Sequence, residues 1–147
     1  MRYLVLMLAL SLLTGIAIAQ DIDQAICNPG TGITFHPNGR LKSCPLKDDF
    51  VINGVNCNQY GVINLYETGA LRSCVTRDYL KYEEISCNQY GLVSFYPSGK
   101  LDTCELSDAV VIEGKPCAAL QPISLFENGR LKSCGVPPLV AGQGRGN

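Results

Sequence analysis

Apolar and polar positions alternate in short segments that Gly-containing turns separate. Residues 33–36 alternate, residues 37–39 (Pro-Asn-Gly) interrupt them, and residues 40–44 alternate again. Alternation with a period of two indicates a half-buried strand. A three-residue loop closed by Gly is typical of a hairpin with a bulge. The pattern therefore predicts a β-hairpin in which Phe35 faces Leu41 and Ile33 faces Ser43.

A short apolar segment follows each hairpin, at residues 50–54 and 110–114 for example. These segments predict a third, shorter strand. After residue 19, no segment has a convincing 3.6-residue apolar period. We expect an all-β fold, an elongated antiparallel meander with two or three strands in each of several similar units.

The eight Cys residues define an internal repeat. They are separated by alternating intervals of 17 and 13 residues, which gives a period of 30. Residues 38–44 recur identically at 128–134. A fixed period of this length indicates a repeat array. We expect a β domain over residues 27–134, with turn glycines at equivalent positions. Its four repeats are 27–56, 57–86, 87–116 and a partial 117–134, and the glycines are Gly39, Gly69, Gly99 and Gly129.

The N-terminal segment, residues 1–19, predicts a secretory signal peptide. Arg2 precedes an apolar run, and Ala17 and Ala19 stand just before Gln20. This is the layout of a cleaved signal, and the apolar run is short of the roughly 20 residues that span a bilayer. We expect a secreted or periplasmic protein without a membrane span after cleavage. The segments outside the repeats are a lead-in, 20–26, and a flexible Gly/Pro-rich tail, 135–147.

The Cys residues suit a disulfide framework better than a metal site. A metal site favours a close pair such as C-x-x-C, whereas an even Cys count behind a signal peptide favours disulfides. Pairing across the longer interval bonds every Cys in equivalent units, whereas pairing across the shorter interval leaves the first and the last Cys unpaired. We therefore expect the pairs Cys27–Cys44, Cys57–Cys74, Cys87–Cys104 and Cys117–Cys134.

Composition opposes several functional classes. The formal net charge of −1 gives no basic footprint for nucleic acid. The single His36 excludes mechanisms that need two imidazoles. The adjacent Glu83 and Glu84 would project to opposite faces of a strand. We expect no enzyme activity, no cofactor and no metal. Recurring Asp residues before the third strand could form a calcium ladder or only shape turns: Asp48, Asp78 and Asp108.

We expect aromatic residues to recur on the sheet face opposite the apolar one, and further Tyr residues stand at the entry to two hairpins. Such a ladder can bind a glycan or a protein, or it can pack across the strands. Basic residues on the returning strands can bind, or can only keep the sheet soluble. The candidate ladder is His36, Tyr66, Tyr96, Phe126, Tyr60 and Tyr90. The basic residues are Arg40, Lys42, Arg72, Lys100, Arg130 and Lys132.

The hairpin motif, aromatic-x-x-Gly-x-Leu-x-Ser, recurs at 36–43, 66–73, 96–103 (with Thr at its end) and 126–133. It resembles the hairpin of MORN-type repeats, and more closely the MORN-variant repeats of bacterial antitoxin-like and envelope proteins. The period here is longer, and each unit carries a pair of Cys. The resemblance implies an elongated antiparallel sheet that serves as an interaction scaffold, with no catalytic residues to carry over.

Three functional hypotheses remain. The first is a non-catalytic binding or structural module of the cell envelope or extracellular space that holds a protein or glycan along the repeat face. The second is an inhibitor or immunity protein that blocks one partner enzyme. The third, a small secreted hydrolase, is opposed by the missing His and carboxylate constellations. Exposed edge strands at both ends of the array would allow self-association.

Overall fold

A computed structural model describes residues 22–30 and 32–137. The predicted signal peptide, residues 1–19, lies outside the described residues, as do residues 138–147 of the predicted tail. The lead-in forms one short 3-10 helix, η1 (Gln24–Ile26).

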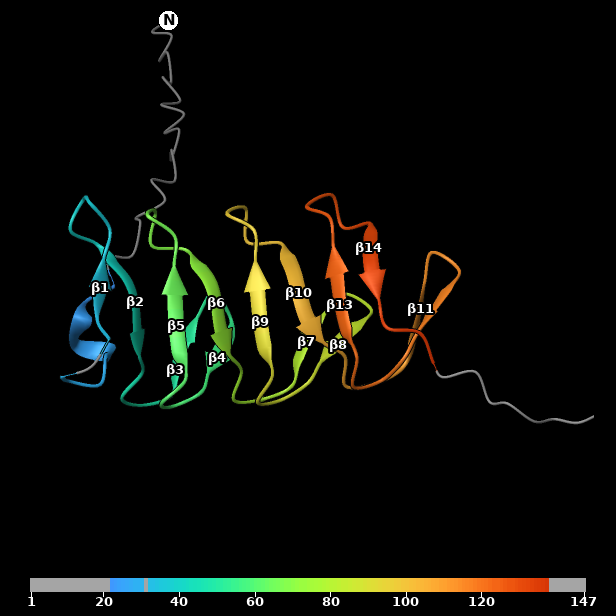
Figure 1. The fold of residues 1–147 in the computed structure, drawn as a ribbon, viewed down its shortest axis with the longest axis horizontal. Helices are drawn as coiled ribbons and strands as arrows, with labels where there is room; N and C mark the ends of the chain where they lie inside the picture. The colour runs from blue at the N-terminus through green and yellow to red at the C-terminus, as the bar shows by residue number, and fades with distance from the viewer. Residues whose placement is uncertain (1–21, 31, 138–147) are drawn as a thin grey trace, which may run out of the picture.

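The hairpins of the four repeats join into one eight-stranded antiparallel sheet, called the main sheet (Figure 1). Each hairpin pairs with the hairpin of the next repeat. This arrangement confirms the all-β meander. The strands, in spatial order, are β1 (Thr34–Phe35), β2 (Leu41–Pro45), β5 (Val62–Leu65), β6 (Leu71–Val75), β9 (Leu92–Phe95), β10 (Leu101–Glu105), β13 (Pro122–Leu125) and β14 (Leu131–Cys134).

Three smaller hairpins form a second layer behind the main sheet (Figure 1). The predicted third strand at residues 50–54 is therefore wrong in detail, because the chain reverses at Asn53-Gly54 and forms two strands. Both turn residues are left-handed, with φ of 51° and 77°, as a two-residue type I′ hairpin requires. Glu83 likewise lies in a turn, not on a strand. The hairpins are β3 (Phe50–Ile52) with β4 (Val55–Cys57), β7 (Leu80–Tyr82) with β8 (Ile85–Cys87), and β11 (Val110–Ile112) with β12 (Lys115–Cys117).

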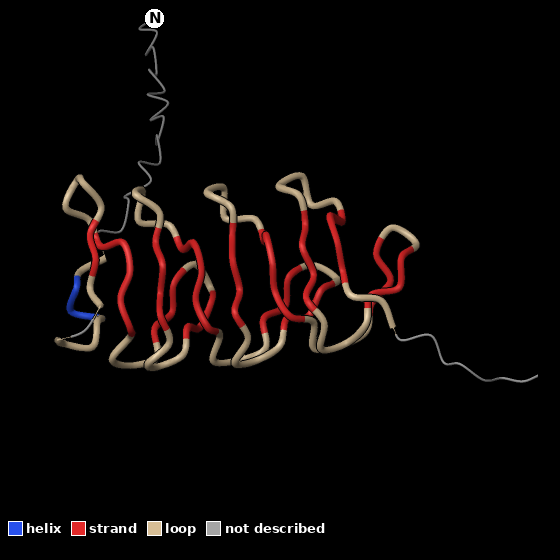
Figure 2. The backbone as a smooth tube through the Cα atoms, viewed as in Figure 1, coloured by secondary structure: helices blue, strands red, loops and turns tan. Residues whose placement is uncertain are grey.

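The turns of the main-sheet hairpins are three-residue loops that lie along one edge of the molecule (Figure 2). The His36 amide donates to the Arg40 carbonyl (2.8 Å), and Gly39 between them has a φ of 82°. The predicted pairing of Phe35 with Leu41 is confirmed, but that of Ile33 with Ser43 is wrong. Thr34 faces Ser43 instead, because a β-bulge inserts residue 42 into the returning strand.

The core lies between the two layers. Leu65 and Leu71 of the main sheet are buried, and so are Ile52 and Val55 of a second-layer hairpin. Burial alternates along the main-sheet strands, as in β5, where the second and fourth residues are buried. Covering one face of the sheet therefore produces the period-two pattern of the sequence.

The pairing of the four disulfides across 17 residues is as predicted, and three of the bonds join the main sheet to a second-layer hairpin. In the second repeat, Cys57 ends strand β4 and Cys74 lies in β6, with their Cα atoms 5.8 Å apart. The equivalent bonds are Cys27–Cys44, Cys87–Cys104 and Cys117–Cys134. A framework of this kind indicates an oxidising environment.

Candidate functional site

The face of the main sheet opposite the second layer is called the open face, because no described element packs on it. It carries three rows that cross the strands. The central row is polar in every strand, because each register pair places a hydroxyl or amide side chain beside the next. Its members are Thr34, Ser43, Asn64, Ser73, Ser94, Thr103, Ser124 and Ser133.

The aromatic residues near the turns link successive hairpins. The Tyr66 hydroxyl donates to the Phe95 carbonyl (2.7 Å), and the Tyr96 hydroxyl donates to the Leu125 carbonyl (2.9 Å). The His36 ring bonds the Leu65 carbonyl in the same way (3.0 Å). Phe126, in the last repeat, has no hydroxyl. This part of the predicted ladder is therefore used within the fold.

Asp102 lies beside the aromatic row in the third repeat. It accepts a hydrogen bond from the Ser94 hydroxyl (3.2 Å). Partial burial of the Tyr96 phenol and the nearby Asp102 carboxylate raise the pKa of Tyr96 above 10.0. The phenol thus stays protonated and remains a donor to the next hairpin at neutral pH.

The link between hairpins predicts a stability effect for Tyr96→Phe. Removing the hydroxyl leaves the Leu125 carbonyl without its donor, so we expect the free energy of unfolding to fall by about 0.5–1.5 kcal/mol. Urea unfolding of the oxidised protein measures this change. Tyr90→Phe is the matched control, because Tyr90 is exposed and should show no change. Equal losses in the two variants would contradict the assignment.

Basic residues lie beside the aromatic residues of the open face, because a β-bulge inserts one residue into each returning strand. The inserted residue of each returning strand is exposed in repeats one, two and four, where it is Lys42, Arg72 and Lys132. The Arg72 guanidinium lies 5.8 Å from the centre of the Tyr66 ring, and the Lys132 ammonium lies similarly over Phe126 (5.9 Å). The bulge therefore places charge on the open face.

Apolar residues form the third row, at the other end of the strands. Val62 and Leu92 are 45% and 60% exposed, and they face Pro45 and Val75 in the neighbouring strands. Neither residue was predicted as part of the site, although the period-two offset of each from the buried residues indicates the open face. This row is called the apolar row, and Glu105 interrupts it before its last member; in spatial order it contains Pro45, Val62, Val75, Leu92, Glu105 and Pro122.

The other predicted ladder residues, Tyr60 and Tyr90, stand just before strands β5 and β9. Both are exposed, as is Leu120 at the equivalent position of the last repeat. All three have left-handed backbones, with φ between 57° and 64°, a conformation that costs a non-Gly residue about 1–2 kcal/mol. The first repeat has Gly30 at this position. Large exposed side chains are thus held next to the apolar row despite a local cost.

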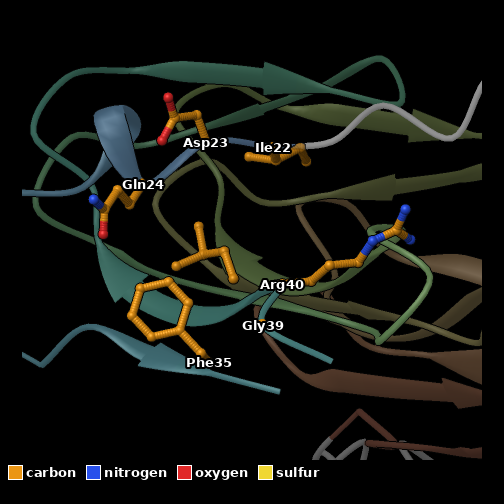
Figure 3. A pocket seen from close by; sticks show the side chains of 7 residues that line it. Ile22, Asp23, Gln24, Phe35, Gly39 and Arg40 are labelled. Atoms are coloured by element: carbon orange, nitrogen blue, oxygen red, sulfur yellow. The ribbon is translucent and has the colours of Figure 1, made fainter. Parts of the chain in front are cut away.

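A cavity of about 490 Å³ lies at the N-terminal end of the array. Figure 3 shows it between the lead-in, with Ile22 and Gln24, and the first hairpin, with Phe35 and Arg40. In later repeats the second-layer hairpin of the preceding repeat precedes each first Cys, whereas here only helix η1 does. The cavity is therefore a consequence of an incomplete second layer.

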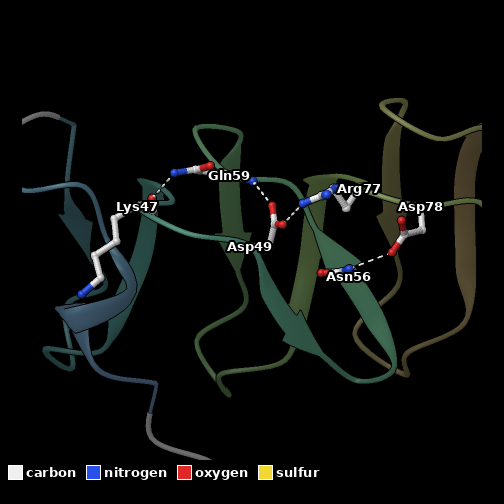
Figure 4. Close-up of polar contacts among 6 residues, drawn as sticks. All are labelled: Lys47, Asp49, Asn56, Gln59, Arg77 and Asp78. Carbon is white, nitrogen blue, oxygen red and sulfur yellow. Dashed lines mark hydrogen bonds and ion pairs between the residues drawn. The ribbon is translucent and has the colours of Figure 1, made fainter.

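A polar network joins the first two repeats on the side of the second layer (Figure 4). The Asp49 carboxylate accepts a hydrogen bond from the backbone amide of Gln59 (2.8 Å) and forms an ion pair with Arg77. The Asn56 side chain donates to Asp78 (2.7 Å). Both charged partners of the ion pair are partly exposed, so the network positions the repeats and contributes little stability.

Two of the three Asp residues of the predicted calcium ladder have separate hydrogen-bond donors. Asp78 accepts from Asn56, and Asp108 accepts from the Ser107 hydroxyl (2.8 Å). Within residues 22–30 and 32–137, no group of three or more His, Cys, Asp or Glu is arranged to hold a metal ion. The same residues contain no helix of the length and hydropathy needed to cross a membrane.

Comparison with known proteins gives no relative: no family model, no curated protein and no solved structure matches this chain.

Proposed function

We propose that this protein is an exported, non-catalytic binding module of the cell envelope or extracellular space, and that it acts through the open face of the main sheet. One observation carries the proposal. The second layer covers one face of the sheet, while the other face keeps apolar side chains such as Leu92 exposed in the middle of the array. Exposed apolar surface rimmed by polar residues is typical of interaction sites.

The proposed location follows from two features. Residues 1–19 have the layout of a signal peptide, and four disulfides suit an oxidising compartment. We therefore place the protein outside the cell or in the periplasm.

The role as a scaffold draws support from the repeat and from its single His. The hairpins resemble those of MORN-variant repeats, which implies an elongated interaction surface. The His36 ring is committed to the Leu65 carbonyl, so it serves the fold and not an acid–base mechanism. The proposal thus assigns binding, not chemistry, to this surface.

Matched pairs of variants test the role of the open face. One double variant, Val62→Asn with Leu92→Asn, removes apolar side chains from the open face. The other, Val51→Asn with Val111→Asn, removes apolar side chains from the second layer. All four residues are exposed, so both variants should fold. Binding is measured by co-sedimentation with insoluble envelope polymer and by capture from secreted fractions. We expect the open-face variant to lose at least about tenfold in affinity, which is about 1.4 kcal/mol, and the second-layer variant to bind as the unchanged protein.

Equal binding by the two variants would rule out the open face as the binding surface. Recovery of one protein in 1:1 stoichiometry, lost after reduction, would instead indicate an inhibitor of a single partner.

A further inference from the structure

We infer that the ligand of the open face is an extended polysaccharide that carries carboxylates, which the basic residues at the bulge positions bind. This inference rests on the proposed function and names its ligand class. Three observations carry it: the basic row, the segregation of charge and the period of the polar row.

The basic row is built by the fold. Each bulge inserts one residue at the same place, and in three of the four repeats that residue is an exposed Lys or Arg: Lys42, Arg72 and Lys132. Arg72 and Lys132 lie over aromatic rings, which fixes their position while leaving the cations exposed. In the third repeat, Asp102 interrupts the row.

Charge is segregated between the two parts of the molecule. The main-sheet hairpins, residues 33–45, 62–75, 92–105 and 122–134, contain six basic and four acidic residues. The remaining described residues contain four basic and eight acidic ones. The formal net charge near zero is therefore the sum of a basic part with +2 and an acidic part with −4. An anionic ligand would be attracted to the hairpins and repelled by the second layer.

The period of the rows favours a polymer with a regular repeat. Two strands separate equivalent residues of successive repeats, a distance of about 9.6 Å at the usual strand spacing. Two sugar units of an extended polysaccharide cover a similar length, so a chain with one carboxylate per disaccharide would match the basic row. The central polar row lies beside the basic row, and Ser73 and Ser94 face one another in it. Its side chains offer donors and acceptors for sugar hydroxyls.

Other anionic partners match this surface less well. A nucleic acid strand carries a phosphate about every 3.4 Å, much denser than one basic group per repeat. An acidic folded protein has no reason to repeat its charges at the spacing of the strands. A periodic ligand of moderate charge density fits the periodic face best.

The test measures binding of the oxidised protein to four defined probes at low and physiological salt. The probes are hyaluronan (one carboxylate per disaccharide), neutral dextran, polyphosphate and single-stranded DNA. We expect hyaluronan to bind most tightly and salt to weaken its binding. Replacing Lys42, Arg72 and Lys132 together by Gln should weaken hyaluronan binding by about tenfold, because each exposed ion pair with a carboxylate contributes only a small part of the binding free energy.

Two further variants sharpen the result. Lys47, Lys81 and Lys115, changed together to Gln, remove the same charge from exposed positions outside the main-sheet hairpins, and hyaluronan binding should not weaken. Asp102→Lys completes the basic row and should tighten binding by about threefold, since one exposed ion pair contributes up to about 1 kcal/mol. Equal losses in the two Gln variants, tighter binding of polyphosphate or DNA, or no binding of hyaluronan at low salt would each overturn the inference.

The two proposals fail separately. If hyaluronan does not bind but the Val62 and Leu92 variant loses an envelope ligand, the open face is the site and the ligand class is wrong. If neither variant of the open face alters binding of any ligand, both proposals are wrong.

Discussion

Reduction of the four disulfides is expected to unfold the protein at room temperature. Each bond closes a loop with a sequence separation of 17 residues, which contributes about 3 kcal/mol by the loop-entropy relation. Four such contributions amount to about 12 kcal/mol, within the range of about 5–15 kcal/mol for the stability of a whole domain. The thin core between two single layers has little stability to replace them.

Circular dichroism during titration with dithiothreitol measures this loss, with full reduction established by mass. The four bonds should not be reduced together. Cys134 is only half-buried on the edge strand β14, whereas Cys44 and Cys74 are buried between strands. We therefore expect Cys117–Cys134 to be reduced first. A fully reduced protein with an unchanged spectrum would show that the fold does not depend on its disulfides.

Leu106→Ala is expected to lower the free energy of unfolding by about 2–5 kcal/mol, the usual cost of truncating a fully buried Leu. Leu106 is 0% exposed, and its backbone links two repeats: its amide donates to the Gln121 carbonyl, and its carbonyl accepts from the Leu120 amide. A cavity here weakens both the core and the junction between the third and fourth repeats. Urea denaturation of the oxidised protein measures the change.

Leu92→Ala is the control for that experiment. It makes the same chemical change in the same repeat, but at a side chain that is 60% exposed on the open face, so we expect a change below about 0.5 kcal/mol. If the two substitutions destabilise the protein equally, the assignment of core and open face is wrong.

The sequence predicted the fold in its main features because the repeat multiplied weak local signals. One hairpin with a closing Gly is ambiguous, but Gly39 has equivalents in three further units. The alternation around Leu41 then identified the core face, and the Cys intervals identified the disulfide pairs. Each of these properties depends on residues close together in the chain.

The second layer was missed because its hairpin is barely longer than a strand. Asn53-Gly54 between apolar residues is a strong turn signal, yet the segment 50–54 alone looks like a strand. In the second repeat the turn contains Glu83 and Glu84, which carry no such signal. Whether a short apolar segment adds to the sheet or folds behind it depends on tertiary packing.

The candidate site was predicted only in part, for a similar reason. Tyr66 and Tyr60 are both aromatic and periodic, but only the structure shows that the Tyr66 hydroxyl bonds the next hairpin while the Tyr60 side chain stays exposed. The bulge at Lys42 also has no distinctive sequence signal. It determines the face that the charge occupies, because a one-residue shift moves a side chain to the other face.

The spacing of the disulfides has a consequence for the order of events during synthesis. In a complete chain, Cys44 has two near partners, and the wrong one, Cys57, is the closer in sequence. In a chain that emerges from its N-terminus at about 5–20 residues per second, Cys27 is already present when Cys44 appears, and Cys57 is still 13 residues behind. Vectorial emergence therefore favours the native pair in each repeat, whereas refolding of the complete reduced chain must compete with the shorter, mispaired loop.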